Sequence, residues 1–170
     1  MTADAGAQTT VVIPVWDEYV AGLPSGALAS LTGQEPAPRI VVVDNASTIA
    51  LPCIEPPAEV VRSSRRLTVG AARNLGLKHV TTPYVVFWDA DDEMLPGTLA
   101  LLESAIGSDP RMAAFGAGIV EAPSGARHRW PRRWIASLIR FPALFALVDS
   151  VWSIYPSTGA TIMKIGRAHV

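Results

Sequence analysis

The stretch Thr9-Thr-Val-Val-Ile-Pro-Val15 is followed directly by Trp16-Asp-Glu18, and this change from apolar to polar residues decides the fold. A short, continuous run of β-branched residues between polar neighbours predicts a strand that is buried on both faces. The same pattern returns in Arg39–Val43 and Tyr84–Trp88, and Val60–Arg62 is a shorter candidate. Strands buried on both faces are typical of a parallel sheet, so we expect these segments to pair with one another.

Helix-like segments separate the predicted strands. Ser25–Thr32, Thr68–His79 and Pro96–Ile106 are predicted helices, with Thr68 as an N-cap and a proline early in the third helix. The remaining segments are predicted as the strand Met112–Val120, the loop Pro123–Pro131 and the strand Ala160–Lys164. Strands that alternate with helices predict an α/β fold with a mostly parallel sheet covered on both faces.

Length and composition allow one globular domain. The chain has 170 residues, of which 49% are hydrophobic and 17% are charged, which is too apolar for a disordered segment. The formal net charge of −1 gives no support to nucleic acid as a partner. Phe141–Val148 is the longest uncharged run of the most apolar late stretch, and it is far shorter than the about 20 residues needed to span a bilayer.

The single cysteine, Cys53, excludes a disulfide framework and fits a reducing compartment. The first ten residues contain no Lys or Arg, so they do not resemble a secretory signal. We therefore expect a cytoplasmic protein. The basic segment Arg127–Arg133 leaves open a peripheral contact at the inner membrane face, and a solvated loop is the alternative that we favour.

Acidic residues follow three of the predicted strands. Asp17-Glu18, Asp44-Asn45 and Asp89-Ala-Asp-Asp92 each stand where an apolar run ends. In an open α/β sheet, ligands bind in the crevice outside the carboxyl ends of the strands. One aspartate at such a position caps a helix or begins a turn more often than it binds a ligand. Three such positions together favour a ligand site.

The pair Asp89 and Asp91 points to a metal. In extended chain, residues i and i+2 face the same side, and two neighbouring carboxylates repel unless a cation or donors lie between them. Mg²⁺ or Mn²⁺ suits such a site, because a hard cation binds one or two carboxylates and completes its coordination with phosphate oxygens and water. This pattern predicts a metal-held diphosphate ligand.

Glycine-rich phosphate loops are absent, because no Gly-x-Gly-x-x-Gly follows the first strand and no Gly-Lys-Ser/Thr occurs. Arg73 and Asn74 are candidates to hold phosphate in their place. The equally weighted alternative is a solvated basic face formed by Arg62, Arg65, Arg66, Arg73 and Lys78.

At this point the sequence resembles the family 2 glycosyltransferases, which have the GT-A fold. The match rests on segments in the family's order: Val12-Ile-Pro-Val-Trp-Asp-Glu18, Val42-Val-Asp-Asn-Ala-Ser47, Gly70-Ala-Ala-Arg-Asn-Leu-Gly-Leu77, Val86-Phe-Trp-Asp-Ala-Asp-Asp-Glu93 leading to Pro96, and Ser157-Thr-Gly-Ala-Thr-Ile-Met-Lys164. The resemblance implies a Rossmann-like three-layer sandwich over residues 1–164. A nucleotide-sugar-binding part would run to about residue 120, and 121–164 would be a partial, incomplete acceptor side.

The resemblance also implies roles for individual residues. The nucleotide-sugar would contact Pro14, Trp16, Glu18, Asp44, Asn45, Arg73, Asp89 and Ala90. The metal would bind Asp91 and Asp89, with Asp91 the main ligand. Asn45 stands where a second aspartate is common in the family, which leaves the base open. The family's general base is an acidic residue downstream of the Lys164 position, so no catalytic residue is assigned.

The function implied is a metal-dependent, inverting transfer of a sugar from a nucleoside-diphosphate sugar to a hydroxyl of a glycan, a lipid-linked molecule or a small molecule. One alternative is a fragment that binds nucleotide-sugar without turnover. A weaker alternative is a phosphatase like the haloacid dehalogenases. Those enzymes carry Asp-x-Asp on the first strand, whereas here it follows about the fourth.

The last six residues, Ile165-Gly-Arg-Ala-His-Val170, resemble the translation of a sequencing adapter. We predict that they are not native and that the natural chain continues beyond Lys164. An ordinary short tail is the alternative.

Overall fold

The computed structural model describes residues 7–54 and 58–106, together with the backbone of four later strands. The strands are β1 (Thr9–Val15), β2 (Arg39–Asp44), β3 (Ala58–Arg62), β4 (Tyr84–Phe87), β5 (Ala113–Phe115), β6 (Gly118–Glu121), β7 (Arg127–Trp130) and β8 (Thr161–Lys164). The helices are α1 (Asp17–Val20), the π-helical turn η1 (Pro24–Leu28), α2 (Ala29–Thr32), α3 (Val69–Leu77) and α4 (Thr98–Ile106).

The main sheet has six strands in the order β3-β2-β1-β4-β8-β5. β1 lies between β2 and β4 and pairs in parallel with both, and β3 extends the parallel part on the far side of β2. β8 pairs antiparallel with β4 and with β5. The sheet is therefore mostly parallel, as the sequence predicts, and all seven residues of β1 are buried.

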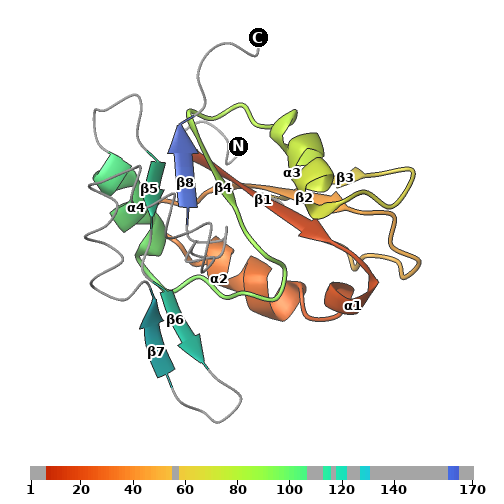
Figure 1. The fold of residues 1–170 in the computed structure, drawn as a ribbon, viewed down its shortest axis with the longest axis horizontal. Helices are drawn as coiled ribbons and strands as arrows, with labels where there is room; N and C mark the ends of the chain where they lie inside the picture. The colour runs from red at the N-terminus through yellow and green to blue at the C-terminus, as the bar shows by residue number, and fades with distance from the viewer. Residues whose placement is uncertain are drawn as a thin grey trace, which may run out of the picture.

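Helices cover both faces of this sheet, which gives three layers (Figure 1). Alternate residues of β1 divide between two cores: Val11, Ile13 and Val15 belong to one, and Val12 belongs to the other. The first core contains residues of η1, α2 and α4, and the second contains Ala72 of α3. The protein is thus an α/β three-layer sandwich.

α3 packs unusually close to the sheet. Its N-terminus is capped by Thr68, whose hydroxyl accepts a hydrogen bond from the N–H of Ala71 at 3.3 Å. A Cβ atom on Gly76 would lie 2.4 Å from Cγ1 of Val12 and 2.8 Å from Cγ2 of Val43, so only glycine permits this approach. The close contact fixes the height of α3 above β1 and β2.

The first and last predicted helices differ from the structure at their ends. Ser25–Thr32 is a π-helical turn that continues into α2, and α1 before it was not predicted. The third helix begins at Thr98 rather than Pro96, because Gly97 has a φ of +76°, which is outside the right-handed helical region.

Two predictions in the second half are wrong. Met112–Val120 is not one strand, because β5 pairs with β8 in the main sheet while β6 pairs with β7 in a separate ribbon. The sequence of this run contains Gly116 and Gly118, and glycine within a strand pattern often marks such a break. The predicted loop Pro123–Pro131 contains β7, a charged segment that backbone pairing to β6 makes a strand.

Residues 131–160 and the suspected non-native tail 165–170 lie outside the described part of the chain. Within the part that is described, no helix is long and apolar enough to cross a membrane.

Candidate functional site

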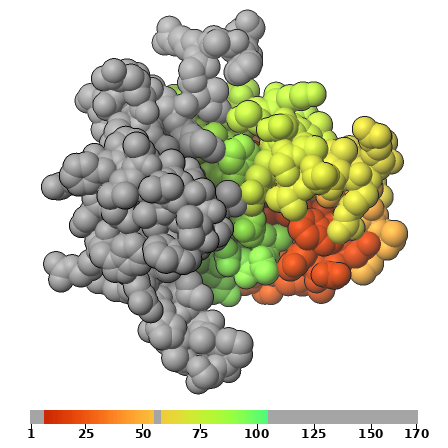
Figure 2. Space-filling view, viewed as in Figure 1, coloured from red at the N-terminus to blue at the C-terminus, as the bar shows by residue number. Residues whose placement is uncertain are grey.

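The carboxyl ends of β1, β2 and β4 meet at one edge of the sheet, because the three strands are parallel neighbours. The predicted acidic segments after these strands therefore gather at this edge. In the space-filling view, the N-terminal segment (red to orange), the β3–α3 segment (yellow) and the segment around β4 (green) adjoin one another (Figure 2).

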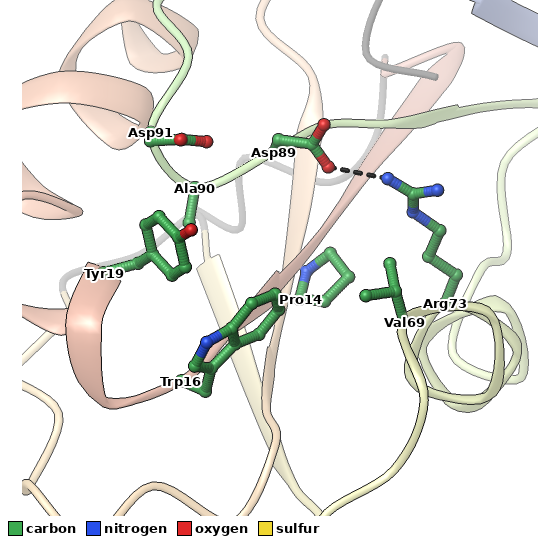
Figure 3. A pocket seen from close by; sticks show the side chains of 8 residues that line it. All are labelled: Pro14, Trp16, Tyr19, Val69, Arg73, Asp89, Ala90 and Asp91. Atoms are coloured by element: carbon green, nitrogen blue, oxygen red, sulfur yellow. Dashed lines mark hydrogen bonds and ion pairs between the residues drawn. The ribbon is translucent and has the colours of Figure 1, made fainter. Parts of the chain in front are cut away.

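A cavity of about 290 Å³ opens at this edge (Figure 3). Its walls contain most of the residues that the sequence predicts for the nucleotide-sugar and the metal, namely Pro14, Trp16, Arg73, Asp89, Ala90 and Asp91. Tyr19 and Val69 complete the lining, and neither was predicted. The cavity thus collects side chains from the end of β1, from α1, from α3 and from the segment after β4.

One wall of the cavity is aromatic. The rings of Trp16 and Tyr19 meet edge to face, with centroids 5.0 Å apart and an interplanar angle of 87°. The guanidinium of Arg66 lies 5.0 Å from the centroid of the Trp16 ring, within the range of a cation–π contact. These contacts orient the indole at the cavity wall.

Another part of the cavity lining is charged. Nη2 of Arg73 donates to Oδ1 of Asp89 at 2.6 Å, and this ion pair joins α3 to the segment after β4. Asp91 is exposed, and no donor among residues 7–54 and 58–106 contacts its carboxylate. Burial, and then repulsion from Asp89 and Asp91, raises the pKa of Asp92 above its ordinary value. Three neighbouring carboxyl groups are therefore concentrated in the segment after β4, and two of them line the cavity.

Asp44 and Asn45 lie at the same edge but line neither this cavity nor the neighbouring one. Asp44 is buried, accepts a hydrogen bond from the N–H of Ser47 at 2.9 Å and forms an ion pair with Arg62. The Asn45 amide is also buried and bonds both backbone groups of Leu67, at 2.8 and 3.0 Å. These two side chains thus hold the loops at this edge of the sheet, and their contact with the nucleotide-sugar stays a prediction.

Asp17 also supports a loop. Its Oδ1 accepts from the N–H groups of Thr48 and Ile49, at 2.5 and 3.1 Å. The hydrogen bond from Ile49, together with those from Thr48 and the charge of Arg66, holds the pKa of Asp17 below its ordinary value despite an opposing effect of desolvation.

Glu18 lies in a second cavity, of about 380 Å³, which shares Tyr19, Ala90 and Asp91 with the first. Glu93 lines this second cavity as well. Asn74, one of the two phosphate candidates, is exposed and lines neither cavity.

The donor atoms at the charged wall fit a hard divalent cation. No group of three or more His, Cys, Asp or Glu side chains within the described ranges is arranged to hold a metal alone. Asp91 offers a carboxylate without a donor from the described residues, and Arg73 engages Oδ1 of Asp89 but not Oδ2. Mg²⁺ and Mn²⁺ are held by such small protein sets when phosphate oxygens complete the coordination.

The residues that the sequence did not single out reach the site through tertiary structure, and Val69 lies on the predicted helix that became α3. Tyr19 is on α1, three residues after Trp16, and it reaches the cavity only because α1 turns the chain back. Arg66 stands in a basic cluster whose members the sequence does not distinguish. Only the loop fixed by Asn45 and Leu67 brings it to Trp16.

The family model described as "Glycosyl transferase family 2" matches residues 10–165. The chain belongs to this family. A comparison with curated proteins gives no match. The family membership agrees with the predicted resemblance, and it disfavours the phosphatase alternative, since Asp89 follows β4 and not the first strand.

Solved structures similar to this family member share its fold. A mannosyltransferase from Pyrobaculum calidifontis, PcManGT, in complex with GDP-Man and Mn²⁺, is 23% identical with a TM-score of 0.53, over 72% of this chain and 38% of that one. TarS 1-349 from S. aureus is 22% identical with a TM-score of 0.52, over 62% of this chain and 34% of that one. The chain thus spans about a third of the length of these structures.

Proposed function

We propose that this chain binds a nucleoside-diphosphate sugar together with a divalent cation, as the donor side of a glycosyltransferase. The observation that carries the proposal is one cavity lined both by the aromatic rings of Trp16 and Tyr19 and by the carboxylates of Asp89 and Asp91. A nucleotide needs both surfaces, because its base is flat and apolar whereas its diphosphate is anionic. The complexes of similar proteins with GDP-Man and Mn²⁺ and with UDP-GlcNAc support this class of donor.

In the proposed complex, Trp16 and Tyr19 bind the base or ribose through ring contacts. Asp91, with Asp89, would hold the cation, and Arg73 would add positive charge beside the diphosphate. A cation held there would supply positive charge against the charge that develops on the departing nucleoside diphosphate. The acceptor would supply a hydroxyl that attacks the anomeric carbon with inversion, and a carboxylate expected downstream of Lys164 would take its proton.

Calorimetric titration tests the donor site. A panel of UDP-, GDP- and dTDP-sugars, each with Mn²⁺, should yield at least one that binds, and binding should require the metal. Asp91→Asn should weaken donor binding roughly 100-fold, since it removes a ligand of the cation while leaving the fold intact. Glu35→Gln is the matched control, because it removes one exposed negative charge outside both cavities.

Unchanged affinity in Asp91→Asn, with both variants folded, would count against the proposal. A turnover assay run beside the titration separates transfer from binding. Donor binding with no sugar transferred to any acceptor, and no donor hydrolysis, would favour the alternative of a binding fragment.

A further inference from the structure

The ion pair between Arg73 and Asp89 divides the two acids of the Asp-x-Asp segment into unequal partners. Asp89 is engaged by an arginine at 2.6 Å, whereas Asp91 meets no donor from the described residues. The two carboxylates are two positions apart in the chain and line the same cavity. They differ because Arg73 pairs with Asp89 and not with Asp91.

Arg73 is a well-held partner. Its side chain is 16% exposed, against 37% for Asp89, and its guanidinium lies 6.0 Å from the centroid of the Phe87 ring. Its Nε is buried and has no hydrogen-bond acceptor among the described residues. Asp89 is the only carboxylate that the described structure pairs with this arginine, so the positive charge of Arg73 acts on Asp89 before any ligand binds.

The backbone also holds this arrangement in place. Arg73 stands one turn before Gly76, where α3 touches Val12 and Val43. Asp89 follows β4, which pairs directly with β1. Arg73 is therefore on a helix that packs against β1, and Asp89 comes directly after Trp88, whose N–H donates to the carbonyl of Val12 on the same strand.

We propose that Arg73 is a positioning residue that holds Asp89 in its cavity-facing orientation and offsets its charge, so that the cation is bound mainly through Asp91. This inference rests on the proposed function and refines it, because Arg73 was placed there only beside the diphosphate. Arginine suits the role better than lysine, since its planar guanidinium fixes the direction of a carboxylate as well as its charge.

The inference predicts opposite changes in two affinities. Arg73→Met releases Asp89 and leaves the cluster of Asp89, Asp91 and Asp92 more negative. The affinity for Mn²⁺ alone should therefore rise roughly three- to tenfold. Donor affinity at saturating Mn²⁺ should fall roughly tenfold or more, because Asp89 is no longer oriented. Arg73→Lys should keep Mn²⁺ affinity near the wild-type value while recovering only part of the donor affinity.

Electron paramagnetic resonance of free Mn²⁺ measures the first affinity, and calorimetry measures the second. In an Asp89→Asn background, Arg73→Met should no longer raise Mn²⁺ affinity, because the released carboxylate is absent. Arg65→Met is the control for a general charge effect, since Arg65 is exposed and forms no ion pair with a described carboxylate. It should change Mn²⁺ affinity less than twofold, roughly the effect of a screened surface charge.

The outcomes separate the two proposals. If the wild-type chain binds a donor with Mn²⁺ but folded Arg73→Met binds Mn²⁺ no better than wild type, the positioning role is overturned and the donor site stands. An equal rise in Arg65→Met, or a persisting rise in the Asp89→Asn background, also overturns it. If the wild-type chain binds no donor with Mn²⁺, the proposed function itself fails.

Discussion

Acidic residues stand at the carboxyl ends of both β2 and β4, but the two sets of side chains differ in how far other parts of the protein bind them. At the end of β2, the buried side chains of Asp44 and Asn45 are hydrogen-bonded to backbone groups, and Asp44 also pairs with Arg62. After β4, Asp91 remains exposed at a cavity wall. A polar group that is already paired has fewer bonds left to offer a ligand, so the two strand ends differ although they share a motif.

The difference arises from the segment that comes after each strand. β2 leads into a tight turn in which Ala46 has a φ of 55°, unusual for a residue other than glycine, and the chain folds back over the acid. The β3–α3 loop then closes onto Asn45 through Leu67. β4 leads into an open segment with Asp89 and Asp91 facing the cavity. The polar residues at the end of β2 therefore support loops, whereas Asp91 after β4 stays accessible to a ligand.

Replacing Asn45 should lower the stability of the fold more than it changes ligand affinity. Asn45→Ala leaves the half-buried N–H and C=O of Leu67 without their partners, so the free energy of unfolding should fall by about 1–3 kcal/mol. Urea denaturation measures this change. Asp91→Asn, the matched substitution at the open edge, should leave the denaturation midpoint nearly unchanged. Equal destabilisation by the two variants would contradict the division between support and site.

Displacing α3 from the sheet should lower both stability and donor affinity. Gly76→Ala places a methyl group against Val12 and Val43, and overpacking of this kind costs about 1–3 kcal/mol. Donor affinity should fall as well, because Arg73 shifts with the helix. Gly70→Ala is the control, since no atom lies within 4 Å of its added Cβ in the first turn of the same helix. Thermal melting that does not separate the two variants would refute the tight contact at Gly76.

The aromatic wall should contribute to binding more than to stability. Trp16→Leu removes the ring beside Tyr19 and Arg66 but keeps an apolar side chain, so we expect donor affinity to fall roughly tenfold. Calorimetry with the best donor of the panel measures this change, and melting temperature checks the fold. If affinity for the donor holds while stability falls, the indole supports packing and not the ligand.

We expect the smallest effect on stability from Glu59, which lies at the amino end of β3, away from the cavity. Glu59 is partly buried, which opposes its charge, but hydrogen bonds from Arg39 and His79 outweigh this and lower its pKa from the ordinary 4.5. Its contribution to stability is complete above the unfolded pKa and is lost as the pH falls through the lower folded pKa. The loss should be below about 1 kcal/mol, because the carboxylate is partly exposed.

Urea unfolding at steps from about pH 6 down to about pH 3 measures this loss. Glu59→Gln should show a shallower decline over the acidic part of that range, and donor binding near neutral pH should be the same in both proteins. A variant whose pH profile matches the wild type would show that Glu59 does not contribute to the acid sensitivity.

Much of the sheet was predictable because buried strands have a recognisable pattern of consecutive apolar residues. β1 has its predicted bounds, and β2 and β4 differ by one residue at one end. The Asp-x-Asp segment, Arg73 and Trp16 were also found as cavity residues, since strand ends and their parallel order fix where they lie. The chain's order of apolar runs and helices was sufficient for the α/β class.

The split between β5 and β6, the strand β7 and the antiparallel β8 were not predictable in this way, because strand pairing joins residues far apart in the chain. The same is true of Tyr19, of Arg66 over Trp16 and of the Arg73–Asp89 pair. The sequence alone determined which acids reach the edge of the sheet. Only the tertiary structure decided which of them are already hydrogen-bonded and which remain open to a ligand, since that depends on donors supplied by distant segments.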